Sequence, residues 1–91
     1  MKFEWDPEKA TANAAKHGVS FEEAISVFGD PLATTVPDPD HSEFEERFIT
    51  TGLSITGRVL IVWHTNQSEI SRIIGSREAT SHERRIYESG E

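Results

Sequence analysis

Six arginines lie in the second half of this 91-residue chain, and their type and spacing suit the binding of an anion. They are Arg47, Arg58, Arg72, Arg77, Arg84 and Arg85. Residues 1–46 carry 3 lysines and 11 acids, whereas residues 47–91 carry 6 arginines and 5 acids. Because one guanidinium can bind two phosphate oxygens, this segregation predicts a local phosphate site. The net charge of −7 argues against a general affinity for long nucleic acids.

Arg72 and Arg77 are the strongest candidates for phosphate contacts. Arg77 ends a predicted strand just before a helix that starts at Thr80, where unpaired backbone N–H groups would add to an anion site. The alternative is that both arginines form solvated ion pairs with some of the 16 acids. Arg47 opens another predicted strand and could face the same surface.

His64 and Lys16 are candidates for proton transfer. His64 shares its parity with apolar residues of its strand, so it is either a core residue or, at the strand end, a residue that reaches a surface site. Lys16 and His17 end a predicted helix, where the helix macrodipole by itself favours cations. Tyr87 is predicted to pack, with base stacking or proton transfer as the alternative.

Several classes of protein are disfavoured by the sequence. Cysteine is absent, which excludes disulfides and thiolate zinc sites. The histidines show no close spacing of metal ligands except His41 with Glu45, in or beside a predicted loop, so we expect neither a metal nor a cofactor. The apolar run 59–63 is too short to span a membrane, and the N-terminus lacks a signal pattern. We therefore expect one cytoplasmic domain over residues 1–91.

Short sequence patterns predict the strands and helices that carry these residues. Residues 2–5 alternate as in a short strand, and Asp6 with Pro7 starts a helix that Gly18 ends. Ser20 and Glu23 form a capping box for a second helix. Residues 37–43 read as a surface loop because they hold two prolines and three acids.

The second half of the chain reads as three strands and a last helix. The predicted strands are 47–54, 58–65 and 70–76, after an earlier strand at 32–36, and a helix follows over 80–88. The strand 58–65 is apolar on both parities, as a central strand is. The predicted fold is an α+β domain of order β-α-α-β-β-β-β-α, with two N-terminal helices packed on an antiparallel sheet and a C-terminal helix at its edge.

These residues resemble the BrnT family of bacterial toxins, the ribonuclease half of the BrnT–BrnA type II toxin–antitoxin pairs. The resemblance covers nearly the whole chain. Its motifs are Phe3-Glu4-Trp5-Asp6 with Lys9, Asn13 with Lys16-His17-Gly18-Val19, Phe21-Glu22-Glu23-Ala24, Val27-Phe28 with Asp30-Pro31, Glu45-Glu46-Arg47 with Gly52, and Arg72-Ile73-Ile74 with Arg77, Ala79-Thr80, Glu83-Arg84 and Tyr87. Each motif is weak alone, and their order and spacing together make a specific match.

The resemblance implies a fold similar to the RelE-type ribonuclease toxins and a metal-independent endoribonuclease that arrests translation and growth. It also implies a partner, a BrnA-like ribbon-helix-helix antitoxin that neutralises the toxin and carries it to operator DNA. The candidate catalytic residues are then His64, Arg72, Arg77, Lys16 and Arg47.

The chain departs from the family pattern at two places. It has Asn66-Gln67 where the family usually has a Glu-Arg pair. In the segment Gly75-Ser76-Arg77-Glu78, Glu78 stands where the family usually has a lysine. Two basic residues are therefore missing near the expected RNA surface. These changes favour a second interpretation, a non-catalytic homologue that acts as an antitoxin-binding co-repressor.

Overall fold

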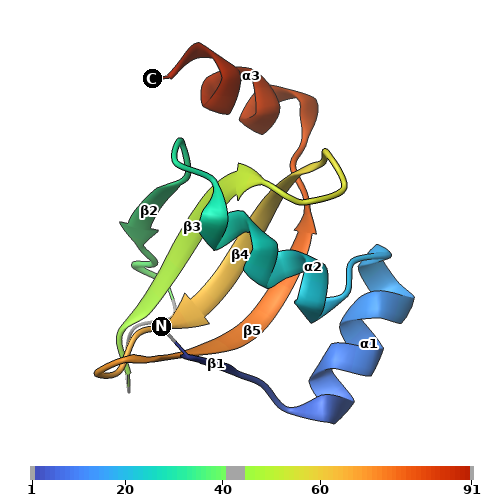
Figure 1. The fold of residues 1–91 in the computed structure, drawn as a ribbon, viewed down its shortest axis with the longest axis vertical. Coiled ribbons are helices and arrows are strands. Elements are labelled where there is room, and N and C mark those ends of the chain that lie inside the picture. Colours follow the sequence, from blue (N-terminus) through green and yellow to red (C-terminus); the bar gives the residue numbers. More distant parts are fainter. Residues whose placement is uncertain (1, 41–44, 91) are drawn as a thin grey trace.

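The computed structural model describes residues 2–40 and 45–90. Its elements follow the predicted order and are, along the chain, β1 Lys2–Glu4, α1 Pro7–His17, α2 Phe21–Ser26, the 3₁₀ helix η1 Val27–Gly29, β2 Thr34–Pro37, β3 Arg47–Leu53, β4 Val59–Thr65, β5 Ile70–Glu78 and α3 Ser81–Ser89 (Figure 1). The prediction of an α+β domain is confirmed. No helix in the described part of the chain is long and apolar enough to cross a membrane.

The five strands form one sheet in the order β1-β5-β4-β3-β2. Strands β2 to β5 are antiparallel neighbours, as predicted. The prediction of a wholly antiparallel sheet is wrong for β1, which pairs in parallel with the start of β5. The period of residues 2–5 indicates a strand but not its partner, which lies about 68 residues later, with Lys2 opposite Ile70.

The predicted helix starts are confirmed. Asp6, Ser20 and Thr80 each accept a hydrogen bond from a backbone N–H of the first turn, and Thr80 forms a complete capping box with Glu83. Gly18 ends α1 with φ of 68°, a left-handed conformation that favours glycine.

Several strand bounds differ from the prediction by one or two residues; β5, for example, runs to Glu78 and not to residue 76. Leu32 is not in a strand because the Asp30 carboxylate accepts a hydrogen bond from the Leu32 backbone and holds a turn there. The predicted surface loop 37–43 is only partly described, since residues 41–44 lie outside the described residues. Asp38 in this loop is buried, contrary to prediction, and its Oδ1 accepts a hydrogen bond from the Asp40 backbone.

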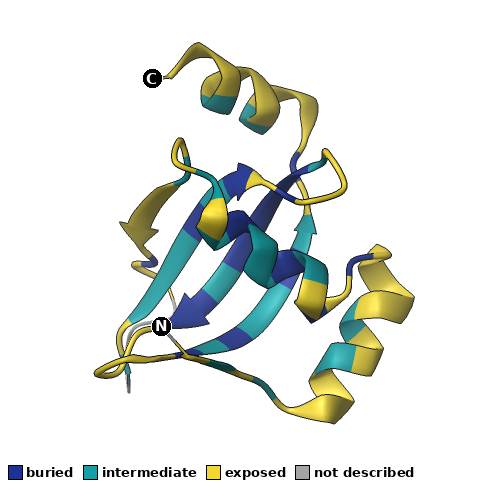
Figure 2. Ribbon diagram, viewed as in Figure 1, coloured by how far each residue is buried: buried dark blue, intermediate teal, exposed yellow. Residues whose placement is uncertain are grey.

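The main core lies between the sheet and the first two helices. Its buried residues are Val19, Phe21, Ala24, Val27, Leu60, Val62 and Ile73. A smaller cluster on the opposite face of the sheet joins Val59, Ile61 and Ala79, with Tyr87 of α3 packed against it. Strand β4 is therefore buried on both faces, as predicted for a central strand, and Figure 2 shows the burial concentrated in the middle strands.

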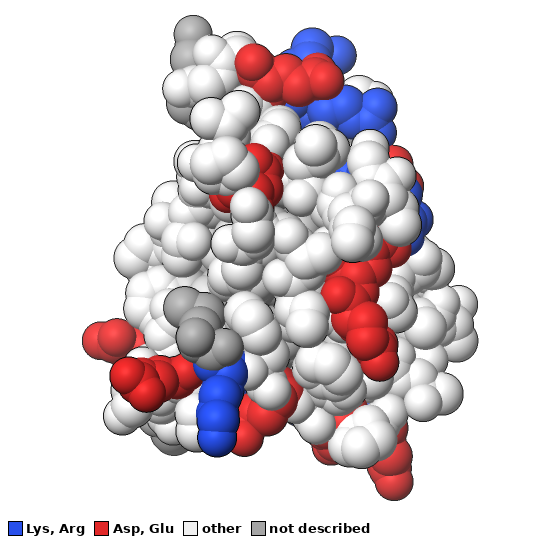
Figure 3. All heavy atoms as spheres, in the orientation of Figure 1, with Lys and Arg blue, Asp and Glu red and all other residues white. Residues whose placement is uncertain are grey.

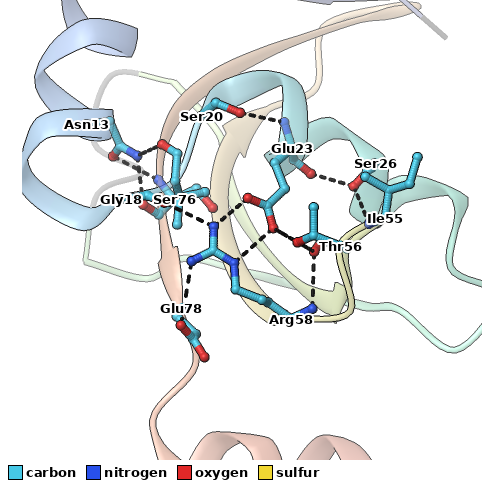
Figure 4. A network of polar contacts seen from close by, with 12 residues as sticks. Asn13, Gly18, Ser20, Glu23, Ser26, Ile55, Thr56, Arg58, Ser76 and Glu78 are labelled. Atoms are coloured by element: carbon cyan, nitrogen blue, oxygen red, sulfur yellow. Dashed lines mark hydrogen bonds and ion pairs between the residues drawn. The ribbon is translucent and has the colours of Figure 1, made fainter.

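Polar contacts fasten the helices to the sheet (Figure 4). The Glu23 carboxylate of α2 accepts hydrogen bonds from Arg58 and from the hydroxyls of Ser54 and Thr56, which ties α2 to the β3–β4 turn. Asn13 of α1 makes three hydrogen bonds, donating to the carbonyls of Val19 and Ser76 and accepting from the Ser76 backbone N–H. These contacts fix both helices on one face of the sheet. Among the helices of the described part of the chain, α3 is the one that packs on the opposite face.

Candidate functional site

The candidate site lies on the face of the sheet that α1 and α2 do not cover, which we call the open face. Alternation along β4 sends Leu60 and Val62 toward the helices and Ile61 and Trp63 toward the open face. Pairing places Arg77 opposite Ile61 and Arg47 opposite Thr65. Residues paired across neighbouring strands share a face, so these arginines belong to the open face.

A β-bulge brings Arg72 to the same face. Residues 72 and 77 differ by an odd number, so a regular strand would send their side chains to opposite faces. The pairing of β5 shifts at Ile74, because Trp63 lies opposite Gly75 while His64 lies opposite Ile73. This extra residue reverses the alternation. The structure thus places three of the five predicted site residues, Arg47, Arg72 and Arg77, on one face of the sheet.

Arg47 and Arg72 meet at Glu45. The Nη2 nitrogen of Arg72 donates to both carboxylate oxygens of Glu45, at 2.6 and 2.8 Å, and Nε of Arg47 donates to one of them at 3.3 Å. The hydrogen bond from Arg72 is the main reason that the pKa of Glu45 lies below its usual range. The side chains are partly exposed, with 41% of Arg72 and 22% of Glu45 accessible.

Arg77 lies over the ring of Trp63, with its guanidinium carbon 5.4 Å from the ring centroid. Its two terminal nitrogens bind the two carboxylate oxygens of Glu83 at 2.7 and 3.0 Å. This pairing lowers the pKa of Glu83 to about 2. Both predicted phosphate ligands are therefore paired with carboxylates of the chain itself, as in the ion-pair alternative, while they keep exposed faces.

Trp63 separates two hollows of the open face. One is a small hollow beside Arg47, Ile74 and Gly75. The other is a groove of about 680 Å³ between the sheet and α3. Its lining includes Leu32, Ile49, Ile61, Trp63, Ile86 and Tyr87. No described residue of α3 is buried, and the groove lies between this helix and the sheet, beside the contact that Tyr87 makes with the smaller cluster.

His64 lies on the other side of the sheet. It is 1% exposed, its Nε2 is 2.7 Å from the Thr50 hydroxyl, and its ring stands edge-on to Phe28. Burial lowers the pKa of His64, which favours the neutral ring. The expectation that a strand-end histidine reaches the surface is not met here, because β4 is covered on that face as far as its end.

Lys16 and His17 are exposed at the C-terminal end of α1, which contacts the sheet from the helix-covered side. They do not join the arginines. The helix-covered side is shown in Figure 3 and is largely uncharged at its centre, with Lys and Arg gathered over α3 and near the N-terminus. A polyanion would find no cluster of cations in the middle of this face.

Tyr87 lies at the groove. Its hydroxyl donates to the Asp30 carboxylate, which raises the pKa of Tyr87 and links α3 to the turn before β2. Within residues 2–40 and 45–90 no group of three or more histidine, aspartate or glutamate side chains could hold a metal ion.

Sequence reasoning missed the side chains that surround the arginines. Glu45 belongs to the Glu45-Glu46-Arg47 motif, but its contact with Arg72 spans 27 residues of sequence. Trp63 shares the parity of Ile61, which indicated only a buried strand face. Glu83 completes the capping box of Thr80, and this local role gives no sign of its contact with Arg77.

Comparison with known proteins agrees with this structure. A family model described as the ribonuclease toxin BrnT of type II toxin–antitoxin systems matches residues 5–83. The crystal structure of the Brucella abortus ribonuclease toxin BrnT superimposes with a TM-score of 0.65 at 26% sequence identity, covering 89% of this chain and 99% of the other. No curated protein matches the sequence. The sequence match over most of the chain and the shared fold together show that this chain belongs to the BrnT family of type II ribonuclease toxins.

Proposed function

We propose that this chain is a metal-independent endoribonuclease that cleaves cytoplasmic RNA, arrests translation and growth, and is held inactive by an antitoxin. The observation that supports it best is that Arg47, Arg72 and Arg77 lie on the same face of the sheet, which also carries Trp63 under Arg77. Arginine forks hold phosphate oxygens and stabilise the charge that develops during phosphoryl transfer. The half-buried indole of Trp63 lines the groove and offers a stacking surface for a base.

Three steps are needed to cut RNA without a metal. The ribose 2′-hydroxyl loses its proton, the extra negative charge on the phosphorus oxygens is stabilised, and the leaving 5′-oxygen gains a proton. The arginines of the open face suit the second step. Lys16 and His64 lie on the other side of the sheet, so the proposed RNA surface uses the three arginines.

The test is cleavage of RNA by the purified chain in the presence of a chelator, with the products mapped. We expect 2′,3′-cyclic or 3′-phosphate ends. Replacing Arg72 or Arg77 with alanine should abolish cleavage and growth arrest with little change in thermal midpoint. The matched control is Arg85→Ala, an exposed arginine of α3. A requirement for magnesium, or 5′-phosphate products, would rule this mechanism out.

The non-catalytic co-repressor is the second candidate. It is favoured by the pairing of Arg72 with Glu45 and of Arg77 with Glu83, because both acids compete with phosphate. Normal growth at confirmed soluble expression of the chain, with no new RNA ends, would decide for this candidate.

We further propose that the antitoxin is a small basic ribbon-helix-helix protein of the BrnA type that covers the arginines and carries the toxin to operator DNA. Opposite charge would speed the encounter with a chain of net charge −7. Added salt should slow association more than it speeds dissociation. Unchanged antitoxin affinity of the Arg72→Ala and Arg77→Ala variants would instead show that inhibition acts from a distance.

A further inference from the structure

Glu45 and Glu83 both bind arginines of the open face, and they differ in whether they also cap a helix. In Glu83, Oε1 accepts from Arg77 and from the Thr80 backbone N–H, while Oε2 accepts from the other nitrogen of Arg77. This carboxylate holds both an arginine and a helix start. Any proton taken up by Glu83 would weaken both.

The Glu45 carboxylate accepts only from arginine side chains among the described residues and caps no helix. Its Oε1 accepts from Arg72 and Arg47, whereas Oε2 accepts only from Nη2 of Arg72 among the described residues. A carboxylate oxygen has two lone pairs, so Oε2 can accept a further hydrogen bond. Glu45, unlike Glu83, can thus receive a proton without releasing a helix cap.

Arg72 can donate hydrogen bonds to Glu45 and to a phosphate at the same time. One nitrogen, Nη2, makes both bonds to the carboxylate, and within residues 2–40 and 45–90 its Nη1 and Nε donate to no protein acceptor. A guanidinium has five N–H donors in one plane. A phosphate oxygen bound to Nη1 would therefore lie next to the Glu45 carboxylate, because Nη1 and Nη2 are neighbours on the same planar group.

We propose, on the basis of the ribonuclease function above, that Glu45 is the general base that takes the proton from the ribose 2′-hydroxyl next to a phosphate held by Arg72. The O2′–H proton passes to Oε2 of Glu45 while O2′ forms a bond to phosphorus. The bond from phosphorus to O5′ breaks, and O5′ leaves with a proton from water. The products are a 2′,3′-cyclic phosphate and a 5′-hydroxyl, and Glu45 then returns its proton to solvent.

The charges around Glu45 suit this role. Arg47 contacts it from β3 and Arg72 from β5, and Glu46 follows it in the chain. The two arginines favour the ionised carboxylate, so Glu45 is in its proton-accepting form at neutral pH. The alternative role is positioning, in which Glu45 only orients Arg47 and Arg72.

The decisive variant is Glu45→Gln, whose amide oxygen can still accept from Arg72 but cannot take up a proton. The matched control is Glu46→Gln, which removes the same charge from the exposed neighbouring residue. Two quantities are measured at pH 7: the rate of RNA cleavage, and the affinity for an uncleavable RNA with 2′-O-methyl groups.

We expect Glu45→Gln to lose about 10²–10⁴-fold in cleavage rate. It should bind the uncleavable RNA at least as tightly as the wild type, because a negative charge near the phosphate is gone. The fall of the rate toward acid pH should be absent in Glu45→Gln and present in Glu45→Asp. Glu46→Gln should match the wild type in rate.

The outcomes separate the proposals. Cleavage by Glu45→Gln at the rate of Glu46→Gln would overturn the assignment of the base and leave the ribonuclease function standing. A parallel loss of cleavage and RNA affinity would assign Glu45 to positioning and also overturn it. Failure of the wild-type chain to cleave RNA at all would overturn the ribonuclease function and the base together.

Discussion

Arg77 uses its planar guanidinium in two ways at once. Its edge binds both oxygens of Glu83, and its face lies over Trp63. A lysine has one charged nitrogen and no flat face, so it can reproduce neither arrangement fully. The side chain is about one-third exposed, which limits its share in stability.

We predict that Arg77→Lys is nearly as defective as Arg77→Ala. Loss of one fixed donor to a developing charge typically costs about 10²-fold or more in rate. Both variants should unfold within about 1 kcal/mol of the wild type, since a partly exposed ion pair contributes little. Cleavage assays and urea unfolding measure the two effects, with Arg85→Lys as control. Full activity of Arg77→Lys would show that a point charge suffices.

At the scale of elements, β3 and the segment that follows α2 approach closely at Gly52. A Cβ atom built there would lie 2.8 Å from Val27 Cγ1 and 2.9 Å from the Cβ of Ala33. The turn at Asp30 also depends on this contact, because the Asp30 carboxylate accepts from the Leu53 backbone N–H. Gly52 therefore lets the turn before β2 lie against the sheet, at the end of the groove.

We predict that Gly52→Ala destabilises the fold by about 1–3 kcal/mol, since overpacking forces its neighbours apart. Gly29→Ala is the matched control, because a Cβ at Gly29 meets no atom within 4 Å and its backbone is not left-handed. Urea unfolding of the two variants gives the comparison. Equal stability of both would mean that β3 and the 3₁₀ helix separate at little cost.

Across the molecule, ion pairs between separate elements offset part of the excess negative charge. Arg58 at the start of β4 binds Glu23 of α2 and lies 3.7 Å from Glu78 of β5. The hydrogen bond from Arg58 is the main cause that lowers the pKa of Glu23 to about 2, from a usual value of 4.5. A carboxyl whose folded pKa is depressed stabilises the fold above its unfolded pKa.

We predict that the stabilisation from Glu23 is complete above pH 4.5 and is lost as the pH falls toward about 2. Glu23→Gln should be less stable than the wild type at pH 7, and the difference should narrow between these limits. Glu22→Gln, an exposed neighbour in α2, should show no such pH dependence. Urea unfolding at several pH values tests this, and a constant gap between Glu23→Gln and wild type would contradict it.

Helices and strands could be predicted from the sequence, because the residues that start and end them lie close together in the chain. The caps at Asp6, Ser20 and Thr80, the left-handed stop at Gly18 and the two-sided apolar strand β4 all act within a few residues. The family motifs indicated the BrnT family, which the family model confirms. The parallel pairing of β1 was beyond these signals, because its partner is distant in the chain.

Which residues share the site depends on how the helices and strands pack, and this could be seen only in the tertiary structure. Strand β4 is apolar on both parities, so the sequence could not say that the helices cover the face of His64 and leave that of Trp63 open. The bulge at Ile74 places Arg72 on the same face of the sheet as Arg77, against the period of two. Glu45 reaches Arg72 only because β3 and β5 flank β4 in the sheet. Faces, bulges and long-range contacts depend on packing between elements, which no local pattern specifies.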